Sequence, residues 1–187
     1  NSLNEKSKII YKRILDAAEK LFYEEGIQAV GVDRVIKEAD VAMNTLYSYF
    51  PSKDTLVEEC LKSRDEKWRK WFVSHLVPSA SLKENVSNLF DALNEWFNEE
   101  NFRGCAFINV VGELGDSKPN IFEISKRHKE NIFQDLLELC KVAKVEKPEI
   151  LAKEISTLIE GAIVRAHLNE DKEAALIAKK TWERFFP

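Results

Sequence analysis

Three polar side chains in the second half of the sequence could form a catalytic set. Asn109 and Glu113 are four residues apart, so they would share one face of a short apolar helix, and His128 follows in the next helical stretch. The sequence has no nucleophile–base spacing, no glycine-rich phosphate loop and no metal-binding motif. His75, His128 and His167 also lack metal-ligand spacing. We therefore expect no enzyme activity, no catalytic residue, no metal and no cofactor.

The same polar residues could instead belong to a small-molecule site. Ten large aromatic side chains lie between Trp68 and Phe133, and a mostly apolar cavity with a few placed polar groups is typical of such a site. The alternative is that these aromatics only form the core of a helical bundle. The candidate ligand-binding residues are Trp68, Phe72, Trp96, Phe107, Asn109, Val110, Glu113 and His128. They would suit a hydrophobic or aromatic compound with a polar or cationic end near Glu113.

A third group of polar residues lies in the stretch MNTLYSYF, residues 43–50. Leu46 and Phe50 are four apart and would face a core. The outward positions then carry hydrogen-bonding groups, on Asn44, Thr45, Tyr47 and Ser48. An asparagine can read adenine, and an apolar Met43 could meet a thymine methyl group.

The elements that must position these residues are all predicted to be helical. Hairpin dipeptides and period-2 alternation are absent, whereas apolar residues recur at helical spacing throughout. About nine helices are expected, near residues 10–25, 32–39, 43–50, 53 to the seventies, 82–98, 105–114, 120–142, 148–167 and from 170 or 171 onward. Gly26 would end the first helix, and Pro148 would open the eighth. The fold class is therefore all-α.

The second and third expected helices are short and about three residues apart, which is the size of a helix-turn-helix. In that motif the second helix lies in the major groove and the first braces it. Ala39 is small enough for two helices to cross closely, and Val41 can fill the gap between them. Helices become long and aromatic-rich after Lys53, which predicts one domain at 1–52 and a second at 53–187.

Residues 32–57, VDRVIKEADVAMNTLYSYFPSKDTLV, resemble the DNA-binding domain of the TetR/AcrR transcriptional regulators. The positions that match the family pattern are Ile36, Ala39, Val41, Thr45, Leu46, Tyr47, Tyr49, Phe50, Ser52, Lys53 and Leu56. The resemblance continues upstream through RILDAAEKLFYEEGIQAV and covers roughly residues 9–60. Asp40 replaces the usual turn glycine, but it tolerates a left-handed backbone better than most residues. Ala42 replaces a frequent serine, which weakens the cap of the next helix.

The resemblance implies an N-terminal three-helix DNA-binding domain and a larger C-terminal helical domain for effector binding and dimerisation. The DNA-facing residues carried over by position are Asp33, Arg34, Met43, Asn44, Thr45, Tyr47, Ser48, Tyr49 and Lys53. For Tyr47 and Tyr49 the alternative is that they only pack the motif. The implied function is a ligand-responsive regulator, most often a repressor, whose partners are double-stranded operator DNA, a small-molecule effector and a second copy of the chain.

The last two expected helices carry wide apolar faces. The candidate dimer-interface residues are Ile155, Leu158, Ile159, Ala162, Ile163, Ala166 and Trp182. Packing within the chain is the alternative explanation for these faces. A C2 dimer is what the resemblance implies, because two recognition helices must reach successive major grooves.

Charge leaves the DNA-binding prediction open. The net charge is −4, and residues 1–53 hold eight basic and eight acidic groups, although phosphate neutralisation needs Lys and Arg. Residues 1–15 are locally basic, with a net charge of +3 from Lys6, Lys8, Lys12 and Arg13 against Glu5. A solvated helix start explains this equally well, and a helical module that binds a protein partner instead of DNA is the alternative function.

The three cysteines, Cys60, Cys105 and Cys140, are far apart, which argues against a disulfide framework and favours the cytoplasm. No secretory signal and no membrane-spanning run are expected.

Overall fold

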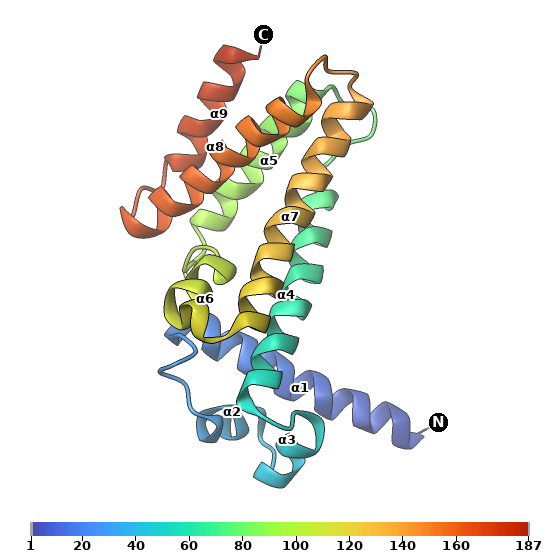
Figure 1. Cartoon of the computed structure of the whole chain (residues 1–187), viewed down its shortest axis with the longest axis vertical. Helices are drawn as coiled ribbons and strands as arrows, with labels where there is room; N and C mark the ends of the chain where they lie inside the picture. The colour runs from blue at the N-terminus through green and yellow to red at the C-terminus, as the bar shows by residue number, and fades with distance from the viewer. Residues whose placement is uncertain (1, 187) are drawn as a thin grey trace. The chain divides into compact units, whose positions relative to one another are not determined.

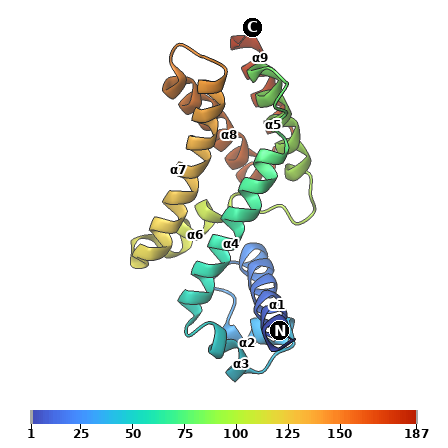
Figure 2. The same cartoon turned by 90° about the vertical axis from the view of Figure 1, so that its right-hand side faces the viewer.

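The regular elements that the computed structural model describes within residues 2–186 are all helices (Figures 1 and 2). In chain order they are α1 (Ser2–Glu25), α2 (Val32–Ala39), α3 (Met43–Tyr49), α4 (Lys53–Ser74), α5 (Leu82–Phe97), α6 (Ala106–Leu114), the short 3₁₀ helix η1 (Gly115–Ser117), α7 (Pro119–Val142), α8 (Pro148–Leu168) and α9 (Ala174–Phe185). The all-α prediction is confirmed, and most predicted boundaries agree within about two residues.

Local chemistry explains where several helices begin and end. Gly26 follows α1 with a φ of +91°, a left-handed conformation that glycine adopts without steric cost. Ser52 caps α4, since its hydroxyl accepts the Thr55 N–H at 3.1 Å. Ser81 and Glu84 form a reciprocal capping box at the start of α5.

Two boundaries differ from the prediction. The first helix already begins at Ser2, well before the apolar stripe that starts at Ile10. The last begins at Ala174 instead of 170 or 171, because Glu170 has a φ of +54°. Asp171 is held in the preceding turn, where its carboxylate accepts the Glu173 N–H at 3.2 Å and pairs with Arg165 at 3.0 Å.

The helices form two compact units. The first contains the chain up to Glu66 together with Ala106–Ser125, and the second contains Lys67–Cys105 and the chain from Lys126 onward. The unit that holds α1, α2 and α3 therefore extends beyond the predicted 1–52 domain, and it includes α6 and the first turns of α7.

Each unit has its own apolar core. In the first unit the fully buried side chains are Ile14, Ala18, Val30, Val35, Leu46, Phe50 and Leu56. In the second, α9 packs against α5 and α8, and buried residues there include Phe90, Phe97, Ile155 and Ala175. No helix within the described part of the chain is long and apolar enough to cross a membrane.

The three cysteines are buried and free of disulfide bonds. Burial raises the pKa of the Cys140 thiol to about 11, because the apolar surroundings disfavour the charged thiolate. Over residues 2–186 we find no cluster of three or more His, Cys, Asp or Glu side chains that could hold a metal ion.

Candidate nucleic-acid interface

The turn between α2 and α3 has the backbone geometry that a helix-turn-helix needs. Asp40 adopts a left-handed conformation, with φ 51° and ψ 57°, as predicted for the residue that replaces the turn glycine. The Val41 N–H donates to the Ile36 carbonyl at 3.1 Å. The Arg13 guanidinium donates to the Asp40 carbonyl at 2.9 Å, so α1 supports the turn from outside the motif.

One face of α3 anchors the helix, and the other is open to solvent. Leu46 and Phe50 are fully buried, and the Tyr11 ring stacks on Phe50 with the ring centroids 5.0 Å apart. The exposed positions of α3 are Met43, Asn44, Tyr47 and Ser48. No side chain caps the helix, as expected from Ala42. The exposed face therefore offers an amide, a phenol, a hydroxyl and a thioether on a rigidly held helix.

Tyr49 is placed differently from Tyr47. Its hydroxyl lies 2.9 Å from the Ser7 hydroxyl in α1, and its ring meets the edge of Tyr11 with the centroids 6.2 Å apart. Tyr49 is half-buried, whereas the Tyr47 side chain is 41% exposed. The packing role that sequence left open therefore describes Tyr49, while Tyr47 remains available to a ligand.

The predicted phosphate-facing cations are engaged within the chain. The Lys53 ammonium donates to the Ile27 carbonyl at 2.6 Å and lies 5.9 Å from the centre of the Phe22 ring. Arg34 makes a two-pronged ion pair with Glu25, at 2.9 and 2.7 Å. Asp33 is exposed at the start of α2. A phosphate would have to share Lys53 and Arg34 with these partners.

Comparison with known proteins agrees with this geometry. Residues 14–60 match the family model described as bacterial regulatory proteins, tetR family. The HTH-type transcriptional regulator YjdC of Escherichia coli (strain K12) is 22% identical over 162 residues, which cover 85% of this chain and 84% of that protein. The crystal structure of SCO4454, a TetR-family transcriptional regulator from Streptomyces coelicolor, superposes with a TM-score of 0.84 and 26% identity over 94% of each chain.

The chain belongs to the TetR family. Its first three helices are the family's DNA-binding domain, and the relatives it matches are transcriptional regulators, not enzymes. The HTH-type transcriptional repressor KstR of Rhodococcus jostii (strain RHA1) is 46% identical over 56 residues, which cover 30% of this chain and 26% of that repressor.

Four of the predicted effector-binding residues of this TetR-family protein come together in the second unit. Trp68 stacks on Phe72 at 5.5 Å between ring centroids and meets Trp96 at 6.4 Å and His128 at 5.6 Å, both edge-on. Trp71 joins them, 5.3 Å from Trp68. Phe72 and His128 are almost completely buried. We call these five residues the aromatic cluster.

The other four predicted effector-binding residues, Phe107, Asn109, Val110 and Glu113, lie on α6 in the first unit. Phe107 and Val110 are buried, and Asn109 is half-buried. The sequence therefore grouped residues from two different units, because the spacing along α6 does not reveal which unit the helix joins.

Glu113 has a structural role that sequence reasoning missed. Its carboxylate accepts the backbone N–H groups of Ile27, at 3.1 Å, and Gln28, at 2.9 Å. The Gln28 side-chain amide donates in return to the Glu113 carbonyl. The sequence does indicate that the backbone N–H groups after the helix-ending Gly26 need acceptors outside the helix. No local pattern identifies a residue of α6 as that acceptor.

The predicted dimer residues lie on α8 and α9, but most face inward. Ile155, Ile159, Ala162, Ile163, Ala166 and Trp182 are buried within the chain, and Leu158 alone among the seven is half-buried. The intrachain packing that the sequence left as an alternative accounts for the six buried residues. Other apolar side chains of the same helices are exposed, namely Ile150, Val164, Leu168, Leu176, Ile177 and Phe185.

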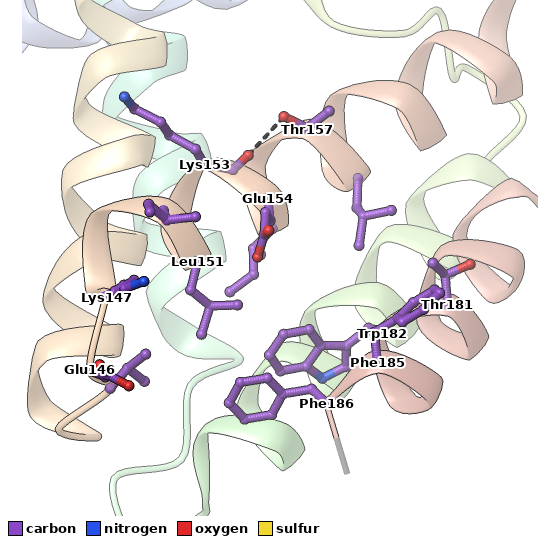
Figure 3. A pocket seen from close by; sticks show the side chains of 14 residues that line it. Glu146, Lys147, Leu151, Lys153, Glu154, Thr157, Thr181, Trp182, Phe185 and Phe186 are labelled. Atoms are coloured by element: carbon purple, nitrogen blue, oxygen red, sulfur yellow. Dashed lines mark hydrogen bonds between the residues drawn. The ribbon is translucent and has the colours of Figure 1, made fainter.

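A groove of about 850 Å³ opens between α8 and α9. Figure 3 shows Trp182 and Phe186 on the α9 side and Leu151 and Glu154 on the α8 side. The Trp182 and Phe186 rings stack with the centroids 4.5 Å apart. The indole N–H of Trp182 donates to the Lys83 carbonyl at 3.1 Å, which fixes the ring in the groove wall.

Proposed function

We propose that this TetR-family regulator is a dimeric repressor that a small, largely hydrophobic effector releases from its operator. The observation that carries the proposal is α3, which Leu46 and Phe50 anchor while Met43, Asn44, Tyr47 and Ser48 stay exposed. A rigid helix with an exposed polar face is suited to the major groove. Repression is favoured by the 46% identity to the KstR repressor over 56 residues.

The DNA-facing residues have distinct roles in this proposal. Asn44 and Met43 contact base edges, through an amide that can read adenine and a side chain that can meet a thymine methyl. Thr45, Tyr47, Ser48, Asp33 and Arg34 contact or approach the backbone and set the register. Tyr49 and Lys53 act indirectly, since both are held by contacts to α1 or to the turn after it.

Dimerisation through α8 and α9 completes the DNA-binding mode. Two recognition helices must lie roughly 34–36 Å apart to meet successive major grooves, and one chain supplies a single α3. The exposed apolar residues of α8 and α9 and the groove between these helices give a second copy an apolar surface to cover. Leu158 is the predicted interface residue that remains accessible to it.

The effector is proposed to bind among the residues of the aromatic cluster. Large aromatic side chains with a buried imidazole match the composition of a small-molecule site. Release requires that the effector bind the conformation with low DNA affinity more tightly than the other, because a ligand with equal affinity for both shifts nothing. A cationic end near Glu113 is not part of this proposal, since that carboxylate already accepts two N–H groups.

The test is a gel-shift titration with the DNA upstream of the protein's own gene, across a salt series. We expect specific binding without effector that weakens steeply as salt rises, since each neutralised phosphate adds about 0.9 to the slope of log K against log salt. No binding even at low salt would refute the proposal. That outcome would favour the alternative of a helical module that binds a protein partner, which the neutral charge of residues 1–53 suits.

A further inference from the structure

Most basic groups of the DNA-binding domain are already occupied. Residues 1–53 contain eight, and five of them bind within the chain: Lys12 to Asp16, Arg13 to the Asp40 carbonyl, Lys20 to Glu38, Arg34 to Glu25 and Lys53 to the Ile27 carbonyl. The other three, Lys6, Lys8 and Lys37, are exposed and make no hydrogen bond or ion pair with the described residues. Two of the three lie in the first turns of α1.

The first turns of α1 lie beside the recognition helix. The Ser7 hydroxyl is 2.9 Å from the Tyr49 hydroxyl at the end of α3. Tyr11, one turn further along α1, contacts both Tyr49 and Phe50. Lys6 and Lys8 flank Ser7 in the sequence, so their side chains leave the helix on either side of this contact. In Figure 1 this end of α1 extends past α3.

We propose that Lys6 and Lys8 form a second DNA-binding surface, the α1 basic surface, which contacts the phosphate backbone next to the groove that α3 enters. This inference rests on the proposed function and adds to it a surface outside the helix-turn-helix. The occupant is the DNA backbone, because a free ammonium on a flexible stem binds a phosphate as a point charge without needing a shaped pocket.

The α1 basic surface explains how a DNA-binding domain without net positive charge can neutralise phosphates. Affinity for DNA comes largely from counterions that are released when lysine and arginine neutralise phosphates. Cations that are already paired, such as Arg34 with Glu25, contribute less of this effect. The free ammonium groups on α1 supply it beside α3, while Glu5 is the single acidic residue among the first fifteen.

The contribution of Lys6 and Lys8 to DNA affinity is independent of DNA sequence, so it is measured by the salt dependence of binding. Each phosphate contact contributes about 0.9 to the slope of log K against log salt, so two contribute about 1.8. Between about 50 and about 200 mM salt, wild-type affinity should therefore fall by about tenfold more than that of a variant lacking both ammonium groups. The difference should be the same on operator and on mixed-sequence DNA, because phosphates are common to both.

The experiment compares the double variant Lys6→Gln/Lys8→Gln with Lys70→Gln/Lys141→Gln in the full chain, because Lys70 and Lys141 lie outside the proposed α8–α9 dimer surface. The control removes two exposed, unpaired lysines from the second unit and changes the net charge equally. Binding is measured by fluorescence anisotropy on the duplex upstream of the gene and on a mixed-sequence duplex. We expect the smaller salt slope in the α1 variant alone, and Lys6→Arg/Lys8→Arg should keep the wild-type slope.

The outcomes separate this inference from the proposed function. Wild-type binding with equal slopes for the α1 variant and the control would overturn the α1 basic surface and leave the regulator intact. Wild-type protein that binds neither duplex would overturn both. Loss of fold cannot imitate the expected result, because thermal melting of each variant is measured alongside, and the substituted side chains are exposed.

Discussion

Replacing Glu113 tests which interaction stabilises the turn after α1 in the first unit. The carboxylate receives two backbone N–H groups, from Ile27 in a partly buried position and from Gln28 in an exposed one. A hydrogen bond to a charged acceptor stabilises a protein by about 1.5–3 kcal/mol, and less where water can replace it. We therefore expect Glu113→Ala to cost about 2 kcal/mol, most of it through the Ile27 N–H.

Glu113→Gln should cost about half as much, because a carboxamide keeps one acceptor oxygen but turns an NH₂ group toward the second N–H. Native-state hydrogen exchange is the assay, since it reports the opening free energy of individual amides. The Ile27 amide should exchange roughly 30-fold faster in Glu113→Ala, the factor that corresponds to about 2 kcal/mol, and the exposed Gln28 amide should exchange faster by a smaller factor.

The matched control is Glu123→Ala, which removes an exposed carboxylate from α7 in the same unit. It should leave both amides unchanged. If Glu113→Ala altered their exchange no more than the control does, the Glu113 carboxylate would not be what holds the turn after α1.

Three further predictions concern other parts of the molecule. Tyr47→Ala should weaken operator binding at least about tenfold, the loss of about one good contact, and should leave the melting temperature unchanged, because this side chain is 41% exposed. Tyr47→Ala/Lys53→Ala should in addition melt at a lower temperature, since Lys53 binds the Ile27 carbonyl. Normal operator binding by the folded double variant would show that α3 is not the recognition helix. Ile177→Glu/Phe185→Glu should convert the dimer to monomer in analytical ultracentrifugation, because these exposed apolar side chains would meet a partner; an unchanged sedimentation coefficient would mean that the dimer forms elsewhere. Burial raises the pKa of the Cys140 thiol to about 11 in the folded chain, against about 9 for a free thiol. The stability that this adds is fully present below pH 9 and is lost as pH rises toward 11, by up to about 3 kcal/mol. Urea unfolding should therefore show a smaller alkaline loss of stability in Cys140→Ala than in wild type, and equal pH profiles would count against it.

Local sequence patterns determined the helices and the motif. Gly26 and Pro148 mark a helix end and a helix start because glycine permits a left-handed backbone and proline suits a first turn. The spacing of Leu46 and Phe50 predicted the buried face of α3, and both are fully buried. These predictions hold because each depends on residues within one or two turns of each other. The cytoplasmic location expected from the cysteines stays a prediction.

Tertiary structure alone decided which side chains remain free to act. Tyr49 and Glu113 look like ligand-facing polar groups in the sequence, yet their hydrogen bonds reach partners 42 and 86 residues away. The apolar stripe of α8 looked like a dimer surface, yet Ile155 and Ile159 are buried in their own chain. Helical periodicity shows that a face is covered but not by which element, because burial is equally favourable against any apolar surface. The sequence therefore determined what each helix can present, and the long-range packing determined which of those groups is left for DNA, effector or partner.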